Sequence, residues 1–141
     1  MLIIWHDSHA SGIQIIDEQR RGLVSIINSL HFSLVFRHKT VKLCSFFDLV
    51  LAYTKIQFNT ERGLMEISGY PRLKEHNLQH EHFIEEVKHL SAICTQEGRE
   101  PEIFLDFMKQ WWKEHILKSD MDCSVYVLEY LRSYHRVIKK R

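Results

Sequence analysis

The chain has 141 residues, of which 45% are hydrophobic and 26% are charged, and its formal net charge is +1 at pH 7. This composition is ordinary for a globular domain, and the small net charge argues against nucleic acid or an anionic membrane as the main partner. Only five Gly and two Pro are present, which disfavours a loop-rich all-β fold.

We expect residues 1–141 to form a single domain, because the chain is long enough to bury one hydrophobic core. Its three cysteines are scattered and show no CxxC spacing, which favours a reducing cytoplasm. The opening run Met1–Trp5 is too short for a signal peptide. No apolar run approaches the ~18–20 residues needed to cross a bilayer. We therefore expect a cytoplasmic protein with no membrane partner.

The first third of the chain predicts an arm followed by a helix. Residues 1–12 are expected to form an extended arm anchored by Trp5. Apolar residues recur at helical spacing from about Ile13 to Phe36, which predicts the first helix. Thr40 is the expected N-cap of the helix that follows.

The rest of the chain predicts three more helices. The second runs from about residue 41 to the stop signal Ser68–Pro71, and the third from about Leu73 to Thr95. Pro101 suits the first position of a fourth helix. Residues 120–141 continue that helix or form a short fifth one. The pattern predicts an all-α, antiparallel four-helix bundle with an N-terminal arm and a C-terminal helical extension.

Two histidines on the third helix are the first candidate metal ligands. His76 and His80 are four residues apart, so both lie on one helix face. That face also carries Phe83 and Val87, so it should point into the core. A buried imidazole needs a partner for its polar nitrogens, and a shared metal ion is one such partner. A core histidine satisfied by hydrogen bonds is the alternative.

Other helices add polar residues to their inner faces. Gln57 and Glu61 are four apart on the second helix, His115 lies on the fourth, and Asp120 follows five residues later. Arg20 lies near the inner face of the first helix. Burying a carboxylate on an apolar stripe is costly unless a cation meets it. In a bundle, such side chains can converge on one metal site.

These motifs resemble those of the bacterial hemerythrin family over most of the chain, from Trp5 to about Leu131. The similar segments are Gly12-Ile13 with Ile16-Asp17-Glu18-Gln19-Arg20, Gln57-Phe58 with Glu61, Tyr70-Pro71 with His76, His80 and Phe83, and Trp112 with His115-Ile116 and Asp120. The resemblance implies a hemerythrin-like bundle in which histidines and two bridging carboxylates hold two irons that bind dioxygen.

Residue by residue, the resemblance implies that His76, His80 and His115 are the three histidine ligands of one iron. It assigns Glu61 and Asp120 as the bridging carboxylates. The family places histidines of the other iron at the positions that Arg20 and Gln57 occupy here.

The two departures weaken the second metal position. Arginine stays charged and has no lone pair to offer, and Gln57 offers only a neutral amide oxygen. A guanidinium is well shaped to bind carboxylates, so we expect Arg20 to stand in for the second iron beside Glu61 or Asp120. The expected cofactor is one iron rather than two, with zinc or no metal as alternatives.

Two other interpretations of the second position remain open. Arg20 extends outward to solvent, or other histidines supply the missing ligands. The histidines available for this are His6, His9, His31, His38, His82, His89 and His135.

For function, we expect a metal-binding sensor or regulatory protein, with dioxygen or nitric oxide as the candidate ligand. A metal-free interaction module and a di-iron oxygen-binding protein are the alternatives. No enzymatic activity is expected and no catalytic residue is assigned, because the sequence has no nucleophile–base pair and no Gly-rich phosphate loop.

The C-terminal extension carries an apolar stripe and a basic end. The stripe consists of Val125, Leu128, Leu131, Tyr134 and Ile138. It predicts docking of a protein partner or a second copy of the chain, or else simple cover for the end of the bundle. The basic residues also suit a helix C-terminus.

Overall fold

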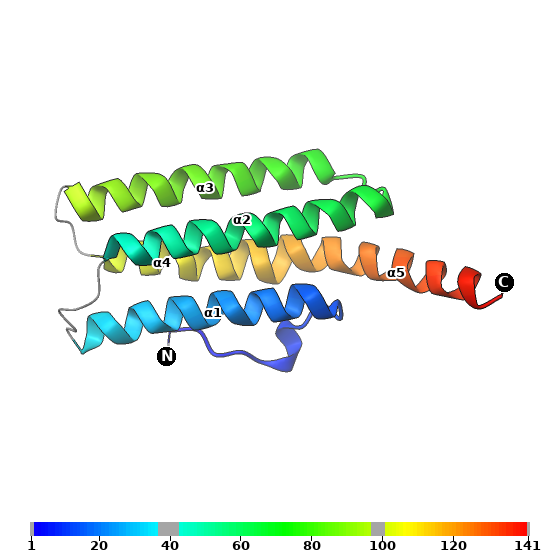
Figure 1. The fold of residues 1–141 in the computed structure, drawn as a ribbon, viewed down its shortest axis with the longest axis horizontal. Helices are drawn as coiled ribbons and strands as arrows, with labels where there is room; N and C mark the ends of the chain where they lie inside the picture. Colours follow the sequence, from blue (N-terminus) through cyan, green and yellow to red (C-terminus); the bar gives the residue numbers. More distant parts are fainter. Residues whose placement is uncertain (1, 37–42, 97–100, 141) are drawn as a thin grey trace.

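The computed structural model describes residues 2–36, 43–96 and 101–140, and it contains helices and no strand within those ranges. Its elements are η1 (Asp7–His9), α1 (Gln14–Val35), α2 (Leu43–Ser68), α3 (Leu73–Gln96), α4 (Glu102–Trp111), η2 (Trp112–Ser119) and α5 (Asp120–Lys139). The helices alternate in direction along the chain, as Figure 1 shows. The predicted antiparallel four-helix bundle is confirmed.

The fourth rod of the bundle is built from three consecutive elements. α4 passes directly into η2, a π-helix, and η2 passes directly into α5. Of the two expectations for residues 120–141, continuation of the fourth helix is therefore correct. Pro101 precedes the first residue of α4 by one position, and the expected N-cap Thr40 lies outside the described residues.

The turn between α2 and α3 explains why these two helices lie side by side. Gly69 has a φ of +67°, a left-handed conformation that glycine adopts without steric cost. The Tyr70 amide donates to the Met65 carbonyl at 2.9 Å, and the Gly69 amide donates to the Glu66 carbonyl at 3.2 Å. This pair of bonds is a Schellman motif, which closes α2 and reverses the chain.

Several side chains of α1 hold the N-terminal arm against the bundle. The Asn28 side-chain oxygen accepts from the amides of Leu2 and Ile3, both at 3.0 Å. Its NH₂ group donates to the Ile3 carbonyl at 2.7 Å. The Arg21 guanidinium lies 4.6 Å from the centre of the Trp5 ring, and Trp5 also packs against Trp112. The arm predicted for residues 1–12 is thus anchored by Trp5, as expected.

The interior consists of two apolar clusters with polar side chains between them. The larger cluster includes Leu23, Phe58, Phe83 and Ile116, and the smaller one includes Ile16, Met65, Cys123 and Val127. Polar side chains are buried where the helices pass from one cluster to the other; they are Arg20, Gln57, Glu61, His76, His80, His115 and Asp120. We call these residues the central polar layer.

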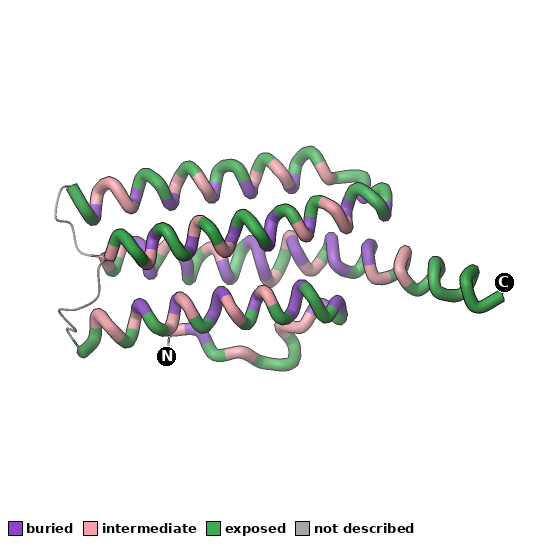
Figure 2. Tube along the Cα trace, viewed as in Figure 1, coloured by how far each residue is buried: buried purple, intermediate pink, exposed green. Residues whose placement is uncertain are grey.

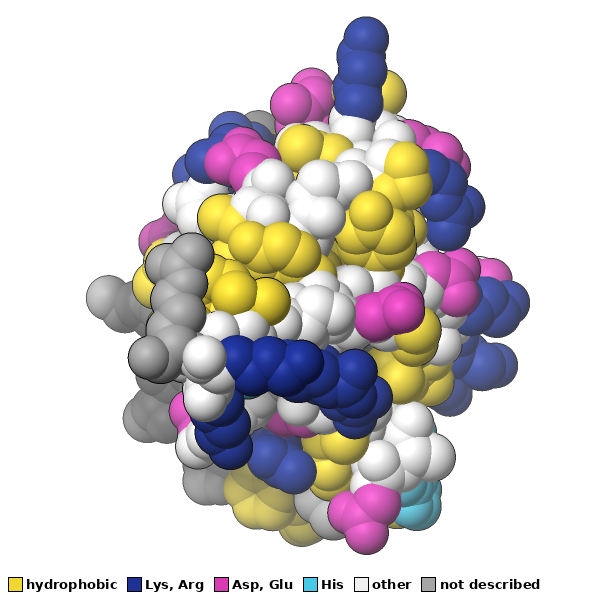
Figure 3. All heavy atoms as spheres, turned by 90° about the vertical axis from the view of Figure 1, so that its right-hand side faces the viewer, with side chains coloured by type: hydrophobic (Ala, Val, Ile, Leu, Met, Phe, Trp, Pro, Cys, Tyr) yellow, Lys and Arg dark blue, Asp and Glu magenta, His cyan; other side chains and the backbone are white. Residues whose placement is uncertain are grey.

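The C-terminal part of α5 leaves the bundle and projects beyond it (Figure 1). Leu128 and Leu131 pack against the smaller apolar cluster, so this part of the expected apolar stripe covers the bundle's end. Val125, Tyr134 and Ile138 are exposed, and the tip of α5 is exposed throughout in Figure 2. Viewed from this end, Lys and Arg side chains lie beside apolar ones (Figure 3). Among the described helices, none is both long and apolar enough to span a membrane.

Candidate metal centre

Three helical rods contribute the candidate ligands of the central polar layer. α3 places His76 and His80 one turn apart on its buried face, and α2 presents Glu61 to them. His115 comes from η2, and Asp120 is the first residue of α5. One nitrogen or oxygen atom from each of His76, His80, His115 and Asp120 lies within 4.8 Å of the others. The structure therefore brings together residues that are far apart in the sequence.

The contacts inside this group are short. Asp120 Oδ1 lies 2.9 Å from His76 Nε2 and 2.9 Å from His115 Nε2. His80 Nε2 lies 3.1 Å from His115 Nε2. Glu61 Oε2 adjoins the group, at 3.2 Å from His80 Nε2 and 3.9 Å from His76 Nε2. All five side chains are buried.

The π-helix η2 accounts for the approach of His115 and Asp120. A π-helix bonds each amide to the carbonyl five residues earlier, so residues five apart lie on the same face. The Asp120 amide donates to the His115 carbonyl in this way. In a regular α-helix, a residue five positions on is rotated well away from the first. Sequence reasoning placed both residues inward but did not identify the π-helix.

Aromatic rings hold two of the imidazoles in place. Phe58 stacks on His80 with 3.7 Å between ring centres and 6° between planes. Trp111 stacks on His115 at 3.8 Å and 12°. These contacts restrict ring rotation before any ion binds, which lowers the entropy cost of binding. Sequence reasoning did not assign this role to Phe58 or Trp111; their placement one turn from the polar positions was the available signal.

Arg20 points into the bundle and is fully buried, at 0% exposure. The alternative interpretation, in which Arg20 extends outward to solvent, is therefore wrong. Its Nη2 lies 3.8 Å from Asp120 Oδ2, and its Nη1 donates to the His9 carbonyl at 3.3 Å. Nη1 also approaches Met121 Sδ at 3.4 Å. A charge this deeply buried requires an opposite charge nearby, and Asp120 supplies it.

Gln57 lies beside the other carboxylate. Its Nε2 donates to Glu61 Oε1 at 3.1 Å, while Glu61 Oε2 faces His80. The two oxygens of Glu61 thus have different partners, an amide on one side and imidazoles on the other. Gln57 itself is 1% exposed, so its hydrogen bond is made away from bulk water.

The electrostatics of the centre favour charged carboxylates. Burial raises the pKa of Asp120, but His115, His76 and Arg20 outweigh burial and hold that pKa well below its usual value. Burial and the charge of Asp120 raise the pKa of Glu61, but His76 and His80 outweigh them and lower it overall. Both side chains are therefore anionic at neutral pH, the form that binds cations.

The pKa values of His76 and His80 are shifted in opposite directions. Burial lowers the pKa of His76, but the contacts with Asp120 and Glu61 outweigh it and raise this pKa to about 9. Burial also lowers the pKa of His80, and there the effect of Glu61 does not reverse it. The contacts with Asp120 and Glu61 thus favour the protonated form of His76 when no ion is bound.

The donor set fits a transition-metal ion. Glu61 Oε2, His76 Nε2 and Asp120 Oδ1 are buried and have no well-directed hydrogen bond within the described ranges, although their neighbours are close. Ligands of an octahedral ion bound at about 2.1 Å lie about 3.0 Å apart, which matches the 2.9–3.2 Å contacts within the group. Imidazole and carboxylate ligands suit iron or zinc.

None of the other described histidines belongs to the group of candidate ligands. His82, His89 and His135 are exposed on α3 and α5, and His31 is half-buried on α1. His6 and His9 pack against each other in the N-terminal arm. His38 lies outside the described residues. Among the residues that the structure describes, no histidine refills the positions of Arg20 and Gln57.

Known proteins called bacteriohemerythrins are similar to the chain over most of its length. The chain is 29% identical over 126 residues to a bacteriohemerythrin of Clostridium acetobutylicum, covering 86% of this chain and 98% of that protein. It is 29% identical over 136 residues to one of Stenotrophomonas maltophilia, covering 96% and 88%. A bacteriohemerythrin of Pseudomonas aeruginosa is 29% identical over 119 residues, covering 84% and 76%. No protein-family model matches the chain.

Proposed function

The chain belongs to the bacteriohemerythrin family by sequence and fold, and we propose that it holds one metal ion in a centre that has lost its second metal position. The proposed ligands are His76, His80, His115, Glu61 and Asp120. Iron is the proposed ion, with zinc as the alternative, because three imidazoles and two carboxylates suit both.

The observation that carries this proposal is the buried guanidinium of Arg20. In the family that the chain resembles, metal-binding histidines stand at the positions of residues 20 and 57. Here Arg20 approaches Asp120 at 3.8 Å, and Gln57 bonds Glu61 at 3.1 Å. Gln57 thus donates a hydrogen bond to Glu61, whereas Arg20 lies near Asp120 without a hydrogen bond to it. The fixed positive charge of Arg20 replaces the charge that a second ion would supply.

A bound ion supplies Lewis acidity or a change of oxidation state, and the chain's residues confine it. The apolar clusters on both sides of the central polar layer exclude bulk water. Phe58 and Trp111 keep the His80 and His115 imidazoles in orientation. His115, His76 and Arg20 together hold the pKa of Asp120 low and so keep this carboxylate anionic. None of these groups is a nucleophile paired with a base, so the proposal is a binding function rather than an enzymatic one.

We assign the centre a sensing or regulatory role, with dioxygen or nitric oxide as the candidate ligand. A lone ion lacks the second metal that shares electrons when dioxygen is bound reversibly. His115 and Asp120 lie on the rod that continues into the projecting part of α5. A change at the ion therefore acts directly on the element that leaves the bundle, where a protein partner or second copy would bind.

A metal-free interaction module is the second candidate, and one observation favours it. The charges of the central polar layer balance without an ion when Arg20 and protonated His76 face Glu61 and Asp120. In that case the buried polar residues would serve only to specify the packing of the bundle.

The deciding experiment is elemental analysis of the protein purified without chelators after metal-replete expression. One iron or zinc per chain is expected, and two per chain would contradict the proposal. A protein without metal would favour the interaction module.

A double variant tests the role of the two replaced positions. Arg20→His/Gln57→His should bind a second ion and develop the absorption of an oxo-bridged di-iron centre. The variant Arg62→His/Arg136→His, at exposed positions on α2 and α5, is the matched control and should bind no additional ion.

A further inference from the structure

His76 differs from the other two imidazoles of the centre in how its ring is held. Parallel aromatic rings stack on His80 and His115. Outside the centre, the ring of Tyr70 meets the imidazole of His76 edge-on, with 6.5 Å between ring centres and 84° between planes. An edge contact at that distance does not prevent rotation of the imidazole, so something else must fix its orientation.

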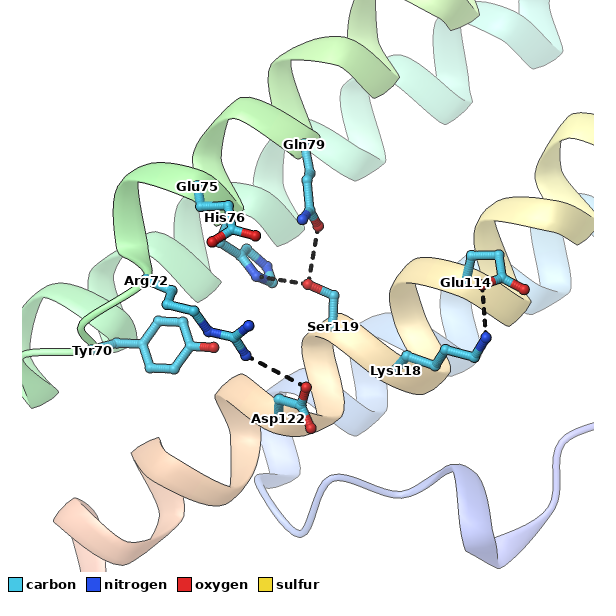
Figure 4. A pocket seen from close by; sticks show the side chains of 9 residues that line it. All are labelled: Tyr70, Arg72, Glu75, His76, Gln79, Glu114, Lys118, Ser119 and Asp122. Atoms are coloured by element: carbon cyan, nitrogen blue, oxygen red, sulfur yellow. Dashed lines mark hydrogen bonds and ion pairs between the residues drawn. The ribbon is translucent and has the colours of Figure 1, made fainter.

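Hydrogen bonds from the outer side of the ring provide that restraint. Ser119 Oγ lies 3.3 Å from His76 Nδ1, and the same hydroxyl donates to Gln79 Oε1 at 3.0 Å. Figure 4 shows the three side chains in a row, with His76 and Gln79 from α3 and Ser119 from the end of η2. They line a polar cavity of about 230 Å³ that also includes Tyr70 and Arg72.

The direction of these bonds follows from counting donors. A serine hydroxyl has one proton to donate, and Ser119 gives it to Gln79. The hydroxyl oxygen can then only accept from His76, so the proton of the neutral imidazole sits on Nδ1. The lone pair is left on Nε2, the nitrogen that faces Asp120 and Glu61. This is the tautomer that binds an ion at the centre.

Two consecutive residues, Ser119 and Asp120, therefore contact the two nitrogens of the His76 ring. Asp120 Oδ1 approaches Nε2 at 2.9 Å, and Ser119 Oγ approaches Nδ1 at 3.3 Å. Both residues lie where the π-helix η2 gives way to α5.

We propose that Ser119, oriented by Gln79, is a positioning residue that fixes the His76 tautomer for metal binding. The inference rests on the proposed function, since it assigns a role to a side chain that touches no ion. Outer hydrogen-bond partners of metal-binding histidines keep the ring in its tautomer and orientation, and their loss typically weakens metal affinity about 10- to 100-fold.

The test compares the affinity for Co²⁺ and Zn²⁺ across a small set of variants, by titration against a competing chelator. Ser119→Ala should lower affinity about 10- to 100-fold, and Ser119→Thr should restore it because the hydroxyl is kept. Gln79→Leu should weaken binding as well, because the freed hydroxyl can turn and donate to Nδ1. Ser133→Ala, an exposed serine on the same helix, is the control and should leave affinity unchanged.

Nitrogen-15 NMR of the metal-free protein, at a pH alkaline enough for neutral imidazoles, gives a second readout. His76 should carry its proton on Nδ1 in the wild type and shift toward the Nε2–H form in Ser119→Ala. Unchanged affinity in Ser119→Ala, or an unchanged tautomer, would overturn the inference. If the wild type binds no ion, the proposed function fails, yet the NMR comparison still decides the role of Ser119.

Discussion

His115 and Asp120 are five residues apart, and a π-helix brings His115 Nε2 to 2.9 Å from Asp120 Oδ1. The hydrogen bond from the Asp120 amide to the His115 carbonyl spans the same five residues. The backbone hydrogen bond and the side-chain contact thus join the same two residues, and we call this five-residue spacing the register of η2. The regular α-helical hydrogen bonds are lost over Trp112–Ser119, and π-helical turns are frequent at functional sites.

Inserting one alanine after Lys118 in η2 tests this register. The insertion places the Asp120 side chain six residues after His115, a spacing that neither an α-helix nor a π-helix brings to one face. We expect the helical circular dichroism signal to persist while metal affinity falls at least about tenfold, because the carboxylate no longer lies beside His115. Lys118→Ala is the control and should bind like the wild type. Full affinity in the insertion variant would show that the register is dispensable.

Loss of a single candidate ligand should remove stabilisation by the ion. An ion at 100 times its dissociation constant stabilises the folded state by about 2.7 kcal/mol. We therefore expect metal to raise the melting temperature of the wild type by several degrees, and to leave that of His115→Ala unchanged. His135→Ala, an exposed histidine on α5, should respond to metal like the wild type. Equal melting temperatures for wild type with and without metal would argue for an empty centre.

Arg20 should be essential for stability even without metal. Arg20→Met keeps much of the side-chain volume but leaves Asp120 buried without its guanidinium. Breaking a buried ion pair on one side typically costs about 3–5 kcal/mol, and urea denaturation of the metal-free protein would measure it. The matched control is Arg62→Met, whose partner Glu66 lies 3.9 Å away on the exposed face of α2. A similarly small loss in both variants would contradict the role given to Arg20.

The raised pKa of His76 predicts how the metal-free protein responds to alkali. Its pKa is about 9 in the folded state against 6.5 ordinarily, so the folded state binds this proton more tightly than the unfolded state. The resulting stabilisation is complete below pH 6.5 and is lost as pH rises through about 9. Urea denaturation from neutral to alkaline pH should therefore show falling stability. His76→Gln should flatten this dependence.

The same proton links metal binding to pH. An ion needs the free lone pair of His76 Nε2, so binding near neutral pH should release about one proton from this residue. Calorimetry in buffers of different ionisation enthalpy would count the protons. Affinity should rise with pH up to about 9 and then level off. Binding without proton release would mean that His76 is not a ligand.

The helices and their inner faces could be read from the sequence alone. Apolar spacing identified α1, α2 and α3 to within a residue or two, because each helix buries one continuous stripe. The same spacing placed His76, His80, Glu61, His115 and Arg20 inward. Spacing could not find Ser119 or Gln79 as partners of His76, because their contact joins η2 to α3 and depends on how the two rods are packed.

The sequence by itself thus determined an all-α bundle with a polar layer, because helix periodicity and burial costs are local properties of the chain. Only the tertiary structure decided that the guanidinium of Arg20 lies beside Asp120 rather than beside Glu61. It also decided that residues 112–119 form a π-helix and that α5 continues the fourth rod. These outcomes depend on charges and packing contributed by other helices, which no local pattern in the sequence contains.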